Sequence, residues 1–185
     1  VPQNYKTAVK WYTLAAKQGD ADAQFNLSWM YRKGQGVPQD DKTAVKWFTL
    51  AAEQGLALAQ TNLGLMYDKG RGVPQNYKTA VKWFTLAAEQ GLALGQSNLG
   101  SMYREGQGVF QNYKTAVKWY RLAAEQGNAY CQYNLGVMYA NGQGVPQNYK
   151  TAVKWFTLAA EQGLALAQIN LGLMYREGQG VHQNY

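Results

Sequence analysis

Five asparagines occupy the same position in five similar segments of the chain: Asn26, Asn62, Asn98, Asn134 and Asn170, here named the asparagine ladder. Each amide side chain offers both a hydrogen-bond donor and an acceptor. A regular row of amides can bind the N–H and C=O groups of an extended peptide backbone, whatever its side chains. In the alternative interpretation, the amides bond to one another or to helix carbonyls and only order the fold. The sequence leaves both interpretations open.

The positions beside the ladder change from segment to segment, and many of them hold bulky apolar side chains. They recur at i, i+3 and i+7, so they share one helix face, here named the variable face. A contiguous apolar and aromatic stripe often marks an interaction surface, which favours a groove for a peptide ligand. Alternatively, these residues pack against neighbouring segments where side-chain volume is forgiving. The variable face comprises Asp22, Phe25, Trp29, Leu58, Thr61, Leu65, Leu94, Ser97, Ser101, Tyr130, Tyr133, Val137, Leu166, Ile169 and Leu173.

Side chains suited to catalysis are scarce. Catalysis needs a nucleophile beside a base, paired carboxylates, or metal ligands that converge on one pocket. The chain has one histidine, His182, and its three serines, Ser28, Ser97 and Ser101, form no Ser-x-x-Lys motif. The glutamates recur about once per segment, too far apart to act as an acid–base pair. We therefore predict that the protein is not an enzyme and that it uses no metal or cofactor.

The chain is basic, with 18 Lys and Arg against 11 Asp and Glu and a net charge of +7. Clustered cations can attract nucleic acid. Ten of the lysines, however, form one stripe opposite an apolar helix face, separated by threonine rather than by stacking aromatics. We expect this lysine face to be solvated and to keep the chain soluble, and we expect no specific nucleic-acid recognition. The lysine face comprises Lys6, Lys10, Lys42, Lys46, Lys78, Lys82, Lys114, Lys118, Lys150 and Lys154.

A single cysteine and the apolar pattern limit the remaining possibilities. Cys131 excludes a disulfide within the chain, and it replaces the alanine or glycine of other segments, so we expect a small buried side chain. No run approaches the roughly 18 apolar residues of a membrane span, so we expect a soluble protein. The compartment stays open between the cytoplasm and the periplasm or exterior of a bacterium.

The segments are copies of a repeat of 36 residues, which starts at Val1, Val37, Val73, Val109 and Val145. The stretch from Asn76 to Gln90 places apolar residues on a wide arc of a helix, with Asn76 as its N-cap and Gly91 as its stop. The stretch from Ala57 to Tyr67 predicts a second helix, in which Gly64 allows close approach of a partner helix. Gly-x-Gly pairs such as Gly70 and Gly72 follow no strand, so we interpret them as turns with positive φ.

No stretch has the alternating, β-branched pattern of a strand, so the sequence predicts an all-α fold of stacked antiparallel helix pairs. The motif Ala-x-Ala-Gln-x-Asn-Leu-Gly-x-Met-Tyr-x-x-Gly-x-Gly-Val-Pro-Gln from Ala57, followed by Ala80-x-x-Trp83-Phe84, resembles the Sel-1-like repeat, a relative of the tetratricopeptide repeat. The resemblance implies a right-handed superhelical solenoid whose Asn-containing helices line the concave face. It also implies full units at 20–55, 56–91, 92–127 and 128–163. A lone second helix at 1–19 precedes them, and a lone first helix at 164–178 and a truncated tail at 179–185 follow them.

From the resemblance and the variable face we expect a bacterial-type adaptor whose concave groove binds a protein or peptide partner. The expected contact residues are the members of the variable face other than Asp22 and Leu166, together with the asparagine ladder. Two alternatives remain. The array could be an assembly module that associates head to tail through its open ends, or an engineered consensus scaffold without a natural ligand.

Overall fold

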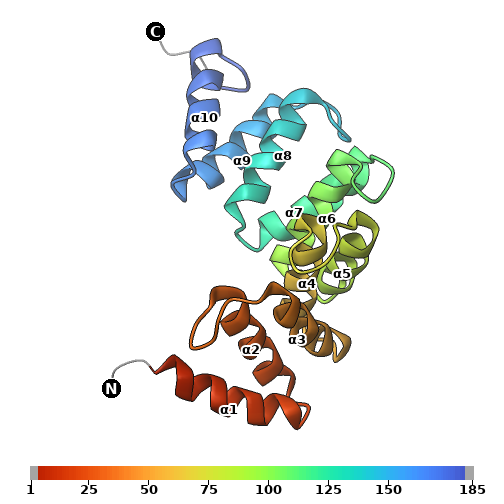
Figure 1. The fold of residues 1–185 in the computed structure, drawn as a ribbon. Helices are drawn as coiled ribbons and strands as arrows, with labels where there is room; N and C mark the ends of the chain where they lie inside the picture. The colour runs from red at the N-terminus through yellow and green to blue at the C-terminus, as the bar shows by residue number, and fades with distance from the viewer. Residues whose placement is uncertain (1–3, 182–185) are drawn as a thin grey trace. The chain divides into compact units, whose positions relative to one another are not determined.

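The computed structural model describes residues 4–181, which contain ten α-helices and no strand (Figure 1). The helices are α1 (Tyr5–Lys17), α2 (Ala21–Lys33), α3 (Asp41–Glu53), α4 (Ala57–Lys69), α5 (Tyr77–Glu89), α6 (Ala93–Glu105), α7 (Tyr113–Glu125), α8 (Ala129–Asn141), α9 (Tyr149–Glu161) and α10 (Ala165–Glu177). The expected all-α repeat fold is therefore confirmed. His182 and parts of the predicted terminal segments 1–19 and 179–185 lie outside the described residues.

Two kinds of helix alternate along the chain. The even-numbered helices contain the Ala-x-x-Gln-x-Asn motif and are here named A helices, and the odd-numbered helices contain Thr-Ala-Val-Lys-Trp and are named B helices. The predicted cap of α5 is present, because Asn76 Oδ1 accepts a hydrogen bond of 3.0 Å from the backbone N–H of Thr79. Gly91 follows the helix with a φ of +85°, as predicted for its stop. The A helix predicted from Ala57 runs two residues further, to Lys69.

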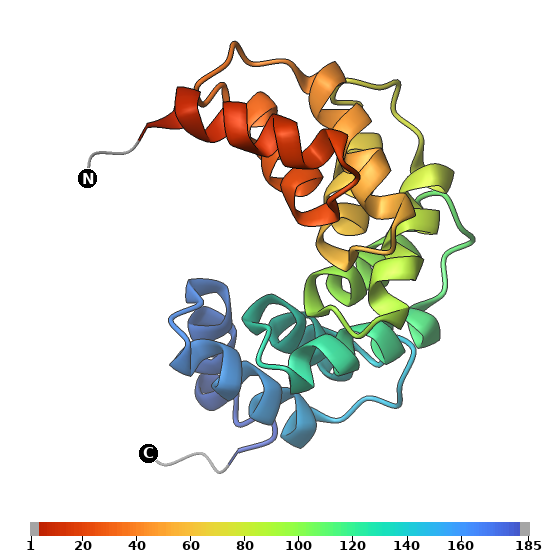
Figure 2. The ribbon, with the colours of Figure 1, turned by 90° about the horizontal axis from the view of Figure 1, so that it is seen from below.

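The chain divides into two compact units, Val1–Gly95 and Gln96–Tyr185, which are described separately here. In the first unit, consecutive helices from α1 to α5 pack against one another (Figure 2). In the second unit, the same holds from α7 to α10. Each helix pair therefore buries its apolar face against the next pair of its own unit.

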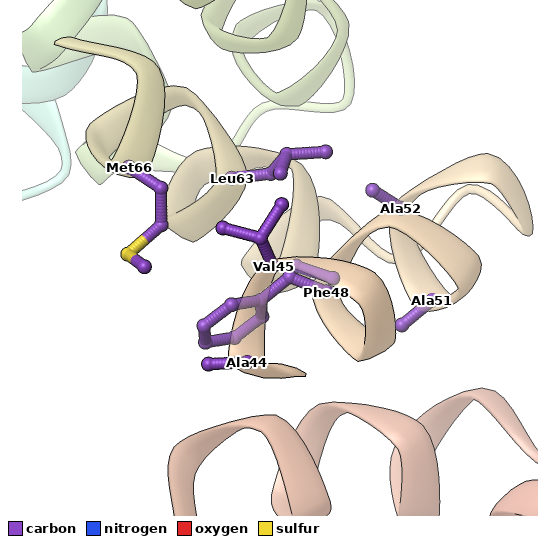
Figure 3. Close-up of a cluster of buried hydrophobic side chains, with 8 residues drawn as sticks. Ala44, Val45, Phe48, Ala51, Ala52, Leu63 and Met66 are labelled. Atoms are coloured by element: carbon purple, nitrogen blue, oxygen red, sulfur yellow. The ribbon is translucent and has the colours of Figure 1, made fainter. Parts of the chain in front are cut away.

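The core of the first unit shows how the apolar arc of a B helix is used. Ala44, Phe48 and Ala51 of α3 are fully buried, and they form one cluster with Leu63 and Met66 of α4 (Figure 3). The alanines keep α3 close to its neighbours, while Phe48 and Leu63 supply most of the apolar area that leaves water. The predicted apolar arc of the B helices thus forms contacts with the helices on either side.

Gly64 lies where α4 meets α5. A Cβ at this position would lie 2.6 Å from the ring of Phe84, which is too close for any side chain. The pair Gly136 and Phe156 repeats this contact in the second unit, also at 2.6 Å. The predicted close approach of a partner helix at Gly64 is confirmed, and it sets the separation between the two helices of a repeat.

The Gly-x-Gly loops tie each repeat to the preceding one. Gly34 and Gly36 have φ values of +68° and +74°, in the left-handed region that was predicted for these turns. A Cβ on Gly36 would lie 2.5 Å from the carbonyl carbon of Tyr5, at the start of α1. The loop after an A helix therefore needs glycine for two reasons, its backbone conformation and its contact with the B helix of the repeat before.

Candidate functional site

Glutamines fix the A helices relative to their neighbours. Gln60 is buried in α4, donates through Nε2 to the carbonyl of Ala52 at 3.1 Å, and accepts from Nε2 of Gln90 at 2.8 Å. Gln132 does the same with Ala124 and Gln162 in the second unit. Sequence reasoning missed this role, although a glutamine stands at both positions in every repeat. Because these bonds join three successive helices, they hold the variable face in place.

The asparagine ladder is engaged in bonds within the protein. The Nδ2 groups of Asn26, Asn62, Asn134 and Asn170 donate to the carbonyl four residues earlier in their own helix, at 2.8–2.9 Å. Asn62 Oδ1 also accepts from Nη1 of Arg32 at 3.2 Å. Both Asn62 and Asn134 are buried. These contacts are the ones that the ordering interpretation predicts, so a peptide backbone would have to compete for these amides. Asn98 belongs to the same row and also has a bonding partner.

The variable face is exposed at its first position in each A helix. In the first unit, Leu58 and Leu94 are each 44% exposed, while Phe25, Trp29 and Leu65 are half-buried. In contrast, Thr61 is fully buried and donates to the carbonyl of Ala57 at 3.0 Å. Thr61 is therefore an interior residue, and this predicted contact residue does not lie at the surface.

In the second unit, the first variable position is exposed as it is in the first unit. Tyr130 is 45% exposed on α8, and Ile169 and Leu173 are 60% and 38% exposed on α10. Tyr133 and Val137 are half-buried against the cluster around Phe156. Among the other members of the variable face in this unit, Ser97 is buried, Ser101 is half-buried and Leu166 is exposed. Asp22 of the first unit is also exposed. Tyr133 and Val137 are covered because α8 packs against the following B helix, whereas the described residues contain no B helix after α10 that could cover Ile169 and Leu173.

Aromatic side chains cluster beside the variable face of α2. The ring of Phe25 lies edge-on to those of Trp29 and Phe48, with centroids 6.4 and 5.8 Å apart. The guanidinium of Arg32 covers the Trp29 ring at 4.7 Å. Burial is the main reason why the pKa of Arg32 is lowered, with repulsion from Arg71 second. The site therefore combines apolar surface with a partly desolvated cation.

A polar cluster replaces an apolar contact in the second unit. Tyr120 stands where α3, α5 and α9 have phenylalanine, and its hydroxyl lies 2.9 Å from Oγ of Ser101. Arg104 donates to Asn134 Oδ1 and places its guanidinium 5.9 Å from the centre of the Tyr120 ring. Burial raises the pKa of Tyr120, so its hydroxyl stays protonated and is satisfied by Ser101.

Cys131 is fully buried, as predicted for a small interior side chain. Burial raises the pKa of its thiol to about 11, and a hydrogen bond with Ser97 opposes that shift. Because the thiolate is the reactive form, this cysteine is inert near neutral pH. Across residues 4–181, no three His, Cys, Asp or Glu side chains are grouped closely enough to hold a metal ion.

All ten lysines of the lysine face are exposed, as expected for a solvated surface. The ammonium groups of Lys82 and Lys118 lie over the rings of Trp83 and Trp119, at 5.4 and 5.0 Å. Within the described part of the chain, no helix has the length and apolar character needed to cross a membrane.

The geometry above is that of an all-α repeat protein built from pairs of A and B helices. The profile of the Sel1 repeat matches residues 1–20, 21–56, 57–92, 93–128, 129–164 and 165–185, which together cover the chain. The chain therefore belongs to the Sel1 repeat family, as the sequence resemblance implied.

Solved structures of Sel1 repeat proteins have the same fold. A protective antigen of uropathogenic Escherichia coli strains, described as having an SLR fold, is 44% identical with a TM-score of 0.96 over 98% of this chain and 39% of its own. A Sel1 repeat protein from Oxalobacter formigenes is 38% identical with a TM-score of 0.91, over 97% of this chain and 72% of its own. Cysteine-rich protein B of Helicobacter pylori is 26% identical with a TM-score of 0.57, over 72% and 96%. A search of curated protein sequences found no match.

Proposed function

We propose that this chain is a non-catalytic scaffold that binds a protein or peptide partner through the variable face of its A helices. The proposal depends mainly on one observation: a position that differs between the repeats is also exposed to solvent. The first variable position of each A helix changes between repeats and is exposed in all five, with leucine or tyrosine in four of five cases. Exposed apolar side chains in a row lower the free energy of a complex that covers them.

The exposure of each side chain in the structure revises the set of predicted contact residues. Leu58, Leu94, Tyr130 and Leu166 are the anchors of this proposal, because they hold the first variable position of their A helices and each exposes more than a third of its surface. Aromatic and aliphatic anchors of this kind carry most of the binding free energy at protein interfaces. The asparagine ladder positions the A helices in this proposal and is not the main contact.

The experiment is selection of displayed peptides on the intact chain, followed by measurement of their affinity for variants. Leu58→Ser, Leu94→Ser and Tyr130→Ser combined should weaken binding at least about tenfold, since each removes buried apolar area from the complex. The matched control replaces three residues of the lysine face, Lys78, Lys114 and Lys150, with glutamine. Circular dichroism checks that both variants keep their helices. Equal affinity of the first variant and the parent would reject the proposal.

A further inference from the structure

An arginine side chain fills the space between two A helices in the second unit. Arg104, in the last turn of α6, donates to Asn134 Oδ1 on α8 and lies against the ring of Tyr120 on α7. In the first unit, Arg32 of α2 reaches Asn62 of α4 in the same way, at 3.2 Å. The repeat thus contains a site for a guanidinium group on its asparagine, and the aromatic ring beside it is Tyr120 of α7 for Arg104 and Trp29 of α2 itself for Arg32.

The next repeat has this site without its arginine. Ala140 of α8 stands at the position of Arg104, one repeat of 36 residues later. A hollow of about 290 Å³ is present there, and Ala140 is one of the residues that line it. The lining also includes Asn170 and Phe156, which correspond to Asn134 and Tyr120.

The chemistry of the hollow suits a cation. Asn170 donates its Nδ2 to the carbonyl of Leu166 at 2.9 Å, as Asn134 does with Tyr130, so its Oδ1 has the orientation that accepts from arginine in the preceding repeat. Glu177 adds a carboxylate, which already pairs with Arg176 at 3.1 Å. A positive group entering the hollow would therefore meet the Asn170 oxygen as an acceptor and would share the Glu177 carboxylate with Arg176.

We propose that this hollow binds the side chain of an arginine that the partner presents. The inference rests on the proposed function, because Asn170 and Leu173 of the predicted contact set line the hollow. The guanidinium lies as that of Arg104 does, with a bond to Asn170 and its plane near the ring of Phe156. Arginine fits better than lysine because its planar group stacks on an aromatic ring and donates in several directions at once.

The test uses the intact chain and three fluorescein-labelled peptides of one sequence, with a central arginine, lysine or citrulline between leucines. Fluorescence anisotropy measures their affinities, and nuclear magnetic resonance locates the perturbed amides. We expect the arginine peptide to bind at least about tenfold more tightly than the citrulline peptide, since a charge-assisted hydrogen bond is lost. The perturbed signals should include Ala140 and the side-chain amide of Asn170.

Two variants that each add one positive charge show whether the peptide is lost because the hollow is filled or because the added charge repels the peptide. Ala140→Arg copies Arg104 and should abolish binding of the arginine peptide while the fold stays intact, because the new side chain fills the hollow. Thr157→Arg copies the exposed Arg121 of α7 and should leave binding unchanged. Equal effects of the two variants, or equal affinities of the three peptides, would overturn the inference. If the affinity of the selected peptides still decreased on substitution of Leu58 and Tyr130, the proposed function would nevertheless remain supported.

Discussion

Single side chains decide how closely the helices of a repeat approach. Gly64 lies against the ring of Phe84, whereas Gly172, at the same position of α10, has no heavy atom within 4 Å of an added Cβ. Glycine thus has a crowded environment at one position and an open one at the other, so the same substitution can be compared at both. Packing predicts opposite effects of one substitution at the two sites.

Gly64→Ala should lower the free energy of unfolding by about 1–3 kcal/mol, because the methyl group forces α4 and α5 apart. Gly172→Ala is the control and should raise it by up to about 1 kcal/mol, since alanine is the better helix former. Urea denaturation followed by circular dichroism measures both. Equal and small effects would mean that contact with Phe84 does not set the helix separation.

Burial of Cys131 makes the free energy of unfolding depend on pH in the alkaline range. In the unfolded chain its thiol ionises at its ordinary pKa of 9.0, whereas burial raises the folded pKa to about 11. The unfolded state loses a proton first, so the stabilising contribution is complete below pH 9.0 and is lost as pH rises toward 11. Urea midpoints of the parent should therefore fall more steeply over this range than those of Cys131→Ala. Parallel curves would contradict the burial of the thiol.

At the scale of helices, glutamine bonds between successive elements define the repeat as much as apolar packing does. Gln132 bonds to Ala124 on α7 and receives a bond from Gln162 beyond α9, so one side chain links three helices. Buried amides that are fully bonded cost little, while a lost partner leaves a desolvated polar group. The A helices keep their position because both partners are present.

Gln132→Leu should lower the free energy of unfolding by about 2 kcal/mol, because it removes two hydrogen bonds of a buried side chain, to the carbonyl of Ala124 and from Gln162. Gln168→Leu is the matched control: Gln168 is exposed and donates only to the carbonyl of Ala160. Its effect should stay within about 0.5 kcal/mol. If thermal denaturation shows the same shift for both, the bond network does not stabilise the stack.

The elements were predictable because each depends on local signals. Caps such as Asn76, stops such as Gly91 and the apolar period act within one helix, so the sequence suffices to predict them. The variable face was harder, because burial depends on the neighbouring helices as well as on the helix itself. Thr61 shares helical spacing with Leu58, yet it is buried while Leu58 is exposed. The bonds of Gln60 and Arg32 join residues 30 positions apart, and no local pattern reveals them.

At the scale of the whole chain, the protein is an array of Sel1 repeats that carries two chemically distinct surfaces. The lysine face is exposed on the B helices and holds ten of the 18 cationic residues. The variable face is exposed at the first variable position of each A helix, where the apolar anchors lie. A partner that binds by burial of apolar area should bind the variable face and not the lysine face, because lysine side chains are strongly hydrated.

The most direct measurement is photo-crosslinking of a selected peptide that carries benzoylphenylalanine, with the attachment sites mapped by mass spectrometry. The proposed function predicts attachment to α4, α6 and α8 near Leu58, Leu94 and Tyr130. Attachment confined to the B helices, around Lys78 or Lys114, would contradict it.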